Sequence, residues 1–182
     1  MDVIQYPDGT KLIPDFLSAQ ECHALILRGE EMGYEEAAIN TGYGQEIFKD
    51  IRNNDRVFFD DVDLAERLFG KIKPYVPKGF NGWKVHGLNE RFRFYRYQPG
   101  QYFKWHRDGS YQRNFREESK ITFMVYLNDD YVGGKTEFRH YQVSPKTGAA
   151  LVFPHPLMHQ GAPIEQGEKY ILRTDVMYRI VF

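Results

Sequence analysis

The sequence predicts a mainly β fold of the α+β class, an antiparallel sandwich or jelly roll with N-terminal helices packed on one sheet. From Arg91 onward, short runs rich in Phe, Tyr, Val, Ile and Thr are separated by turn signals such as Gln98-Pro99-Gly100. Two helix patterns come before these runs. Because a doubly wound fold would alternate helices with strands, this order favours a β core in the C-terminal half.

The first helix is expected to start after Ser18 and to run to about Gly33. Ser18 and Glu21 form a capping box, in which each side chain accepts a hydrogen bond from the backbone N–H of the other residue. Apolar residues follow from Cys22 onward, as they would on the buried face of a helix.

A second helix is predicted from Asp61 or Asp63 to about Tyr75. Leu64, Leu68 and Ile72 would share one face, and prolines end the pattern. The polar, glycine-bearing segment 40–56 between the helices is expected to be a loop.

The turn signals delimit six strands, at 91–97, 101–106, 120–127, 135–138, 149–154 and 169–182. At 182 residues the chain is about the size of one domain. We therefore expect a single domain over 1–182, with a helical part at about 1–80 and a β core at about 88–182.

The composition indicates which binding partners and which cellular compartment to expect. With 24 basic and 25 acidic residues the net charge is −1, so neither a nucleic-acid partner nor a membrane surface is expected. The single cysteine, Cys22, excludes an internal disulfide, and the N-terminal residues lack the pattern of a signal peptide. Both observations favour a cytoplasmic protein.

His106, Asp108 and His159 are the strongest candidate metal ligands. In an extended segment residues i and i+2 project to the same side, so His106 and Asp108 can reach one ion. His159 follows a predicted strand and its turn. Two histidines and one carboxylate form the facial triad typical of non-haem iron(II), whereas a structural zinc site would more often use cysteine.

Five sequence blocks carry a resemblance to a known family. They are Tyr97-Gln98-Pro99-Gly100-Gln101-Tyr102-Phe103-Lys104-Trp105-His106-Arg107-Asp108, Val125-Tyr126-Leu127-Asn128, Gly133-Gly134-Lys135-Thr136-Glu137-Phe138, Pro145-Lys146-Thr147-Gly148-Ala149-Ala150-Leu151-Val152-Phe153 and His159-Gln160-Gly161-Ala162-Pro163-Ile164. In order and spacing they resemble the iron(II)- and 2-oxoglutarate-dependent dioxygenases, most closely the prolyl 4-hydroxylase-like branch. The resemblance covers roughly residues 90–180.

The resemblance implies a double-stranded β-helix in which His106, Asp108 and His159 hold Fe(II) and 2-oxoglutarate chelates the iron. It further implies that Lys169, ten residues after His159, pairs with the far carboxylate of 2-oxoglutarate. The tyrosines Tyr97 and Tyr126 correspond to residues that hydrogen-bond this cosubstrate. Ascorbate is expected to help by returning oxidised iron to iron(II).

Two assignments leave alternatives open. Arg173 shares a strand face with Lys169 and is expected to bind the metal-proximal carboxylate or an acidic substrate. It could instead take the far carboxylate, or simply pair with Asp175. His155 is the rival third ligand, but it lies between two prolines, and the family block begins at His159.

The substrate is expected to be a peptidyl prolyl residue or a small amino-acid-like metabolite, hydroxylated with release of succinate and CO2. Trp105 and Arg113 are the expected contacts, within a rim that also includes 52–56 and 109–119. The alternatives are a metal-free jelly-roll binding module and a zinc-dependent hydrolase. A binding module leaves the ligand spacing unexplained, and a zinc hydrolase leaves Lys169 unexplained.

Overall fold

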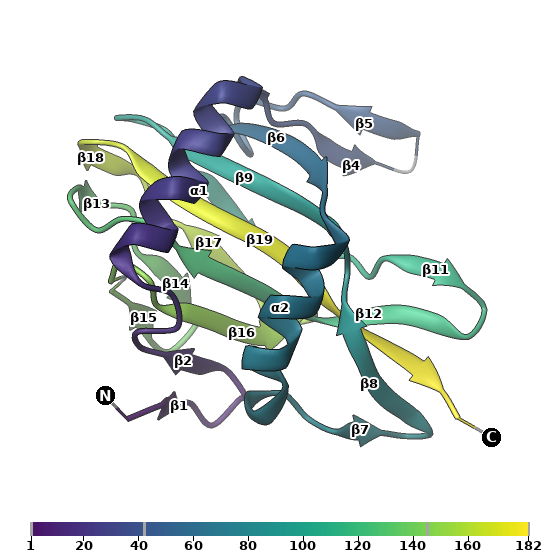
Figure 1. Ribbon diagram of the computed structural model, residues 1–182. Helices are drawn as coiled ribbons and strands as arrows, with labels where there is room; N and C mark the ends of the chain where they lie inside the picture. Colours follow the sequence, from purple (N-terminus) through teal and green to yellow (C-terminus); the bar gives the residue numbers. More distant parts are fainter. Residues whose placement is uncertain (1, 42, 145, 182) are drawn as a thin grey trace.

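The computed structural model describes residues 2–41, 43–144 and 146–181 and is mainly β, as predicted. Two α-helices lie across the front of a large sheet (Figure 1). They are α1 (Ala19–Met32) and α2 (Val62–Ile72), the second continued by a short 3-10 helix, η1 (Lys73–Tyr75).

The large sheet has the strand order β1-β2-β16-β12-β19-β9-β6-β3, with β11 beside β12, and β8 and β7 beside β19. Its strands are β1 (Ile4–Gln5), β2 (Lys11–Ile13), β3 (Glu35–Glu36), β6 (Asp55–Asp60), β7 (Gly79–Phe80), β8 (Trp83–Leu88), β9 (Arg91–Tyr97), β11 (Gln112–Asn114), β12 (Glu117–Tyr126), β16 (Ala150–Pro154) and β19 (Lys169–Ile180).

A smaller sheet has the order β10-β17-β14-β15, and two two-stranded sheets, β13 with β18 and β4 with β5, complete the described strands. Their bounds are β4 (Ile39–Thr41), β5 (Gly44–Glu46), β10 (Phe103–His106), β13 (Val132–Gly133), β14 (Thr136–Phe138), β15 (Gln142–Val143), β17 (His159–Gly161) and β18 (Ile164–Gln166). The pair β4 and β5 projects at the upper right of Figure 1.

Two apolar cores lie on opposite faces of the large sheet, because successive side chains of a strand alternate between faces. On β12, Phe123 and Val125 join the core that includes the buried residues of α1 and α2. Met124 and Tyr126 join the second core, which includes Phe138 of the small sheet. The second core is the one that borders the candidate site.

The predicted elements are largely present. Ser18 caps α1 with both hydrogen bonds of the capping box, Gly33 follows the helix, and Asp61 caps α2. The predicted strand 91–97 has the bounds of β9, and the other five overlap β10, β12, β14, β16 and β19.

The prediction of a loop over 40–56 was wrong in part, because β5 and the start of β6 fall within it. Strands of two or three residues, such as β17, were also missed. A stretch this short shows no periodicity, and its pairing depends on partners distant in the sequence. Among the described residues, neither helix has the length and apolar character needed to cross a membrane.

Candidate metal centre and adjoining cavities

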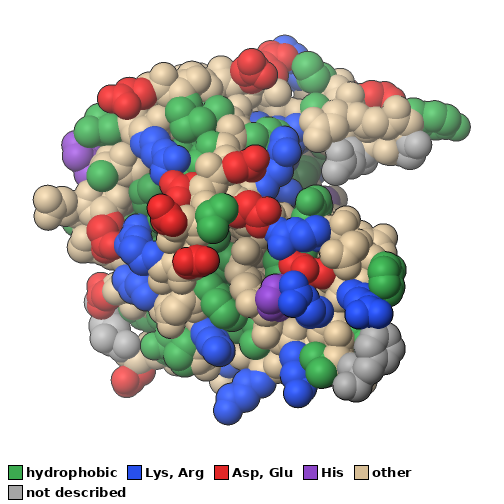
Figure 2. Space-filling model, turned by 45° about the vertical axis from the view of Figure 1, so that its right-hand side comes forward, with side chains coloured by type: hydrophobic (Ala, Val, Ile, Leu, Met, Phe, Trp, Pro, Cys, Tyr) green, Lys and Arg blue, Asp and Glu red, His purple; other side chains and the backbone are tan. Residues whose placement is uncertain are grey.

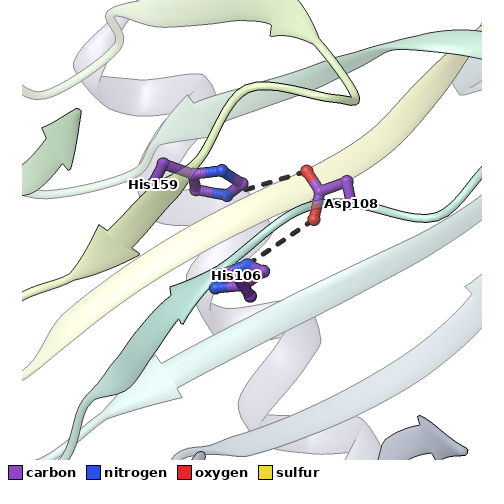
Figure 3. Close-up of side chains that lie close together, drawn as sticks. All are labelled: His106, Asp108 and His159. Carbon is purple, nitrogen blue, oxygen red and sulfur yellow. Dashed lines mark ion pairs between the residues drawn. The ribbon is translucent and has the colours of Figure 1, made fainter. Parts of the chain in front are cut away.

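The small sheet brings the three predicted ligands together. Strands β10 and β17 pair antiparallel with His106 opposite His159, and Asp108 follows β10 by two residues. Nε2 of His106 lies 3.6 Å from Oδ1 of Asp108, and Nε2 of His159 lies 3.7 Å from Oδ2 (Figure 3). One ligand atom from each residue lies within 4.8 Å of the others, which is close enough to share one ion.

Backbone carbonyls orient both imidazole rings. Nδ1 of His106 donates to the Lys104 carbonyl at 2.6 Å, and Nδ1 of His159 donates to the Leu157 carbonyl at 2.9 Å. A carbonyl only accepts, so in each neutral ring the proton is on Nδ1 and the lone pair on Nε2. Burial lowers the pKa of His159 to about 4, which keeps this ring neutral at physiological pH. His159 therefore turns an unprotonated Nε2 toward Asp108, and Nε2 of His106 faces the same carboxylate.

Asp108 is a buried carboxylate with its own supports. Its Oδ2 accepts a hydrogen bond of 2.6 Å from the Thr122 hydroxyl and lies 3.0 Å from Nη2 of Arg173. Burial alone would raise the pKa of Asp108, but the Arg173 guanidinium outweighs burial and holds the pKa well below its usual range. The carboxylate is therefore ionised, as a metal ligand must be.

His155 lies outside the triad and supports it from behind. Its Nε2 and Nδ1 are 2.9 Å from the hydroxyls of Ser119 and Thr122, respectively. Its backbone carbonyl accepts from the backbone N–H of Asp108 at 3.1 Å. Both ring nitrogens of His155 thus lie within hydrogen-bonding distance of hydroxyls, one of which, that of Thr122, donates to Asp108.

Lys169 is a buried cation in a small cavity beside His159. Its side chain is 2% exposed, and Nζ donates to the Gly134 carbonyl at 2.5 Å. Within the described part of the chain, no carboxylate pairs with it. Burial lowers the pKa of Lys169 to about 7, so the ammonium lacks the anionic partner that would hold it charged.

The two predicted cosubstrate tyrosines flank this lysine. Nζ of Lys169 lies 5.4 Å from the ring centroid of Tyr97 and 5.6 Å from that of Tyr126. The hydroxyl of Tyr126 shares a hydrogen bond of 2.7 Å with Thr136, which lines the cavity together with Tyr97. The open volume of this cavity is about 30 Å³, far smaller than that of the cavity in front of the triad.

A second and larger cavity, of about 470 Å³, opens in front of the triad; we call it the front cavity. His106 and Asp108 line it together with five arginines, Arg52, Arg56, Arg93, Arg107 and Arg173. The other lining residues are Ala38, Ile39, Ile51, Tyr95, Phe103, Gly109, Ser110 and Tyr111. The metal centre thus borders both cavities, with Arg173 common to the two.

The structure does not bring the two expected substrate contacts into this cavity. Arg113 pairs with Glu90 and with the buried carboxylate of Glu117, and it is absent from the lining. Trp105 is 45% exposed and is absent from the lining as well. Of the expected rim, the segments 52–56 and 109–119 do contribute Arg52, Arg56 and Tyr111.

Tyr95 and Arg93 are the residues that sequence reasoning missed. They alternate with Phe92 and Phe94, which are fully buried in the core under the helices. Residues i and i+2 of a strand share a face, so Arg93 and Tyr95 lie on the same side as Tyr97. This alternation is visible in the sequence and would have identified Arg93 and Tyr95 as residues on the same face as Tyr97.

Known proteins show clear similarities to this chain. The family model of the 2OG-Fe(II) oxygenase superfamily matches residues 92–174. Prolyl 4-hydroxylase 1 of Arabidopsis thaliana is 22% identical over 197 residues, which cover 93% of this chain and 69% of that protein.

Three solved structures share the fold. The viral collagen prolyl hydroxylase from Paramecium Bursaria Chlorella virus-1, in its 2OG complex, has a TM-score of 0.66 and 22% identity over 96% of this chain and 98% of that one. A Pseudomonas putida prolyl-4-hydroxylase has a TM-score of 0.70 and 19% identity, over 97% and 95%. A prolyl hydroxylase from Trichoplax adhaerens, in complex with a hypoxia inducible factor peptide fragment, has a TM-score of 0.66 and 16% identity. The match covers 96% of this chain and 84% of that one.

Proposed function

Because this chain is a 2OG-Fe(II) oxygenase of the prolyl 4-hydroxylase-like kind, we propose that it hydroxylates a prolyl residue in a peptide, with His106, Asp108 and His159 as the iron ligands. The observation that carries the ligand assignment is the orientation of the two imidazoles. Both Nδ1 atoms are engaged by carbonyls, and both Nε2 atoms lie within 3.7 Å of an ionised carboxylate.

The three ligands would occupy one face of the metal and leave the other positions free. Iron(II), together with 2-oxoglutarate and dioxygen, supplies the oxidising chemistry that hydroxylates a C–H bond and releases succinate and CO2. The protein's own part is to hold this arrangement and to exclude water. Phe103 stacks on the His106 ring at 3.5 Å and Phe153 packs edge-on against His159 at 4.6 Å, which keeps both rings in place.

For 2-oxoglutarate we propose Lys169 as the partner of the far carboxylate, assisted by Tyr97 and Tyr126. The buried, unpaired ammonium supports this role, since a carboxylate would supply the missing counter-charge. Arg173 lies at the metal end of the cavity, since its Nη2 contacts Asp108 directly at 3.0 Å. We assign Arg173 to orienting Asp108 rather than to the far carboxylate.

The proposal also includes a fold type, a reductant and a cellular location. The large and small sheets, with the metal centre between them, are those of a double-stranded β-helix, with α1 and α2 covering the outer face of the large sheet in a single domain. Ascorbate is proposed to sustain turnover by reducing oxidised iron. A cytoplasmic location is proposed from the sequence features alone.

A peptide substrate is supported by the size of the front cavity and by the peptide held in the Trichoplax adhaerens relative. A small amino-acid-like metabolite is the second candidate, because an arginine-rich cavity also suits the carboxylate of a free amino acid.

The test is 2-oxoglutarate turnover by the purified protein with Fe(II), measured as succinate formed in the presence of proline-containing peptides or free amino acids. Under anaerobic conditions, Fe(II) plus 2-oxoglutarate should also give a weak visible charge-transfer band. A metal-free binding module or a zinc hydrolase would show neither succinate formation nor this band. The absence of both signals would reject the proposal.

A further inference from the structure

The front cavity carries more positive charge than the described residues neutralise. Among the described residues, Asp108 is the one carboxylate in its lining, against five arginines. Asp108 lies 3.0 Å from Arg173, and the buried Asp175 lies 3.7 Å from Arg173 and 3.4 Å from Arg93. Both carboxylates are therefore engaged by the two arginines nearest the metal centre.

Arg52, Arg56 and Arg107 make no ion pair with any residue in the described ranges. Arg107 is exposed and donates to the Pro156 carbonyl. Arg56 donates to the Gln45 amide oxygen at 2.7 Å, and burial together with Arg52, Arg93 and Arg173 lowers the pKa of Arg56 to about 10. Repulsion between Arg56 and the neighbouring arginines indicates that this site lacks an anionic partner within the described residues.

Arg52 is the clearest case. It is 4% exposed, and its guanidinium lies between two rings, 4.5 Å from the centroid of Tyr95 and 4.3 Å from that of Phe103. Nε donates to the Asn54 side chain at 2.6 Å, but Nη2 is buried without a hydrogen-bond partner in the described structure. A buried charge left unpaired is costly, and stacking on rings offsets only part of that cost.

The backbone fixes Arg52 relative to the metal ligands. Arg52 forms a β-bridge with Phe103, and the N–H of Lys104 donates to the Ile51 carbonyl at 2.9 Å. The segment that carries Arg52 is therefore attached to β10, the strand that ends at His106. An anion held by Arg52 would be at a constant distance from the triad.

Like charges also face each other within the sheet. Arg93 on β9 and Arg173 on β19 are direct cross-strand partners, and Asp108 and Asp175 offset the repulsion between these two arginines only. The pKa of Tyr95 shows the effect of this positive charge. Burial alone would raise the pKa of its hydroxyl, but Arg173, Arg52 and Arg93 lower it to about 7. The outer surface shown in Figure 2 differs, because Lys and Arg side chains there are interspersed with Asp and Glu.

We propose that Arg52 and Arg56 bind a carboxylate of the prime substrate in the front cavity, so that the enzyme selects acidic substrates over neutral ones. This inference rests on the proposed function and specifies its substrate class. Planar guanidinium groups match the two oxygens of a carboxylate, and those of Arg52 and Arg56 have no carboxylate partner among the described residues. The carboxylate comes either from an acidic side chain beside the target residue or from the free α-carboxylate of an amino acid.

Direct binding tests this selection without relying on turnover. Three fluorescein-labelled peptides, identical except for Glu, Gln or Lys beside a central proline, are titrated with the Fe(II)-loaded protein under nitrogen. L-proline and L-prolinamide, as competitors, form the second arm. We expect the Glu peptide to bind at least about tenfold tighter than the Gln peptide, or L-proline at least about tenfold tighter than the amide, with the preference falling as salt increases.

Variants test which residues cause the preference for a carboxylate. Arg56→Gln should abolish it, and Arg56→Glu should reverse it in favour of the Lys peptide. Arg52→Lys, which keeps the charge without the planar fork, should weaken it. Arg67→Gln, on the helical face and paired with Glu21, is the matched control and should retain it. Melting temperatures confirm that each variant is folded, and 2-oxoglutarate affinity is measured in parallel.

Equal binding of the charged and neutral members of both pairs to the wild-type protein would overturn the inference. So would a preference that survives in Arg56→Gln and Arg56→Glu, or a loss in these variants of 2-oxoglutarate binding instead of substrate selection. Loss of the proposed function is distinguishable, because it would show as absent 2-oxoglutarate turnover whatever the binding preference.

Discussion

Nη2 of Arg173 lies 3.0 Å from Oδ2 of Asp108, so the carboxylate between the two histidines has a cationic partner built into the next sheet. Arg173 comes from β19 of the large sheet, whereas Asp108 follows β10 of the small one. This ion pair links the two sheets at the proposed metal centre and keeps Asp108 ionised in a buried position.

Arg173→Met should lower the free energy of unfolding of the metal-free protein by about 3–5 kcal/mol, because it leaves buried carboxylates without their charge partner. Fe(II) should recover part of this loss, since the ion becomes the partner of Asp108. The increase in melting temperature on adding Fe(II) under nitrogen should therefore be larger in the variant than in wild type. Arg96→Met, which breaks an ion pair with Glu30 away from the centre, should show the wild-type increase. Equal increases in Arg173→Met and wild type would contradict this account.

Alanine at His106, Asp108 or His159 should each abolish the Fe(II)–2-oxoglutarate charge-transfer band and 2-oxoglutarate turnover, because two remaining ligands no longer form a facial set. His86→Ala removes an exposed histidine on β8 and should keep both. A His159→Ala protein that still bound iron, with a His155→Ala protein that did not, would transfer the ligand role to His155.

Thr122→Val should weaken Fe(II) binding by about 10–100-fold, because Asp108 loses the 2.6 Å hydrogen bond that orients it. Thr122→Ser retains a hydroxyl and should restore much of the affinity. Anaerobic titration with Fe(II) measures both. Wild-type affinity in Thr122→Val would show that Arg173 alone positions the carboxylate.

The affinity for 2-oxoglutarate should fall as the pH rises above 7. The pKa of Lys169 is lowered to about 7 in the free protein, so above this pH the lysine must take up a proton to pair with a carboxylate. The dissociation constant should then rise about tenfold per pH unit. Lys169→Arg should remove this dependence, since arginine remains charged. Lys169→Met should cost about 2–5 kcal/mol of binding at pH 7. A flat profile in wild type would contradict the assignment.

The same lysine predicts how stability depends on pH. Between pH 7 and the ordinary lysine pKa of 10.5, the unfolded chain holds a proton on Lys169 that the folded protein does not. The unfolded state then binds more protons, so the free energy of unfolding should rise with pH over this window. Urea titrations of wild type and Lys169→Met at pH 7, 8 and 9 isolate the contribution, because the variant should lack this rise.

Local patterns in the sequence determined which residues are able to meet. Capping residues set the starts of both helices. The two-residue period of a strand placed Lys169 and Arg173 on one face, and in the structure both line a common cavity. The same period, with the family blocks, picked out His106, Asp108 and His159, which the small sheet brings together. These features depend on neighbours in the chain, so they are legible without the fold.

Tertiary structure decided which charges find partners. Arg113 is engaged by Glu90 and Glu117, and Arg173 by Asp108, whereas Arg52 is buried between two rings without an anion among the described residues. All three look alike in the sequence. An arginine's role is set by the distance and burial of groups brought close by strand pairing across the fold, because Coulomb attraction and desolvation depend on separation in space and not along the chain.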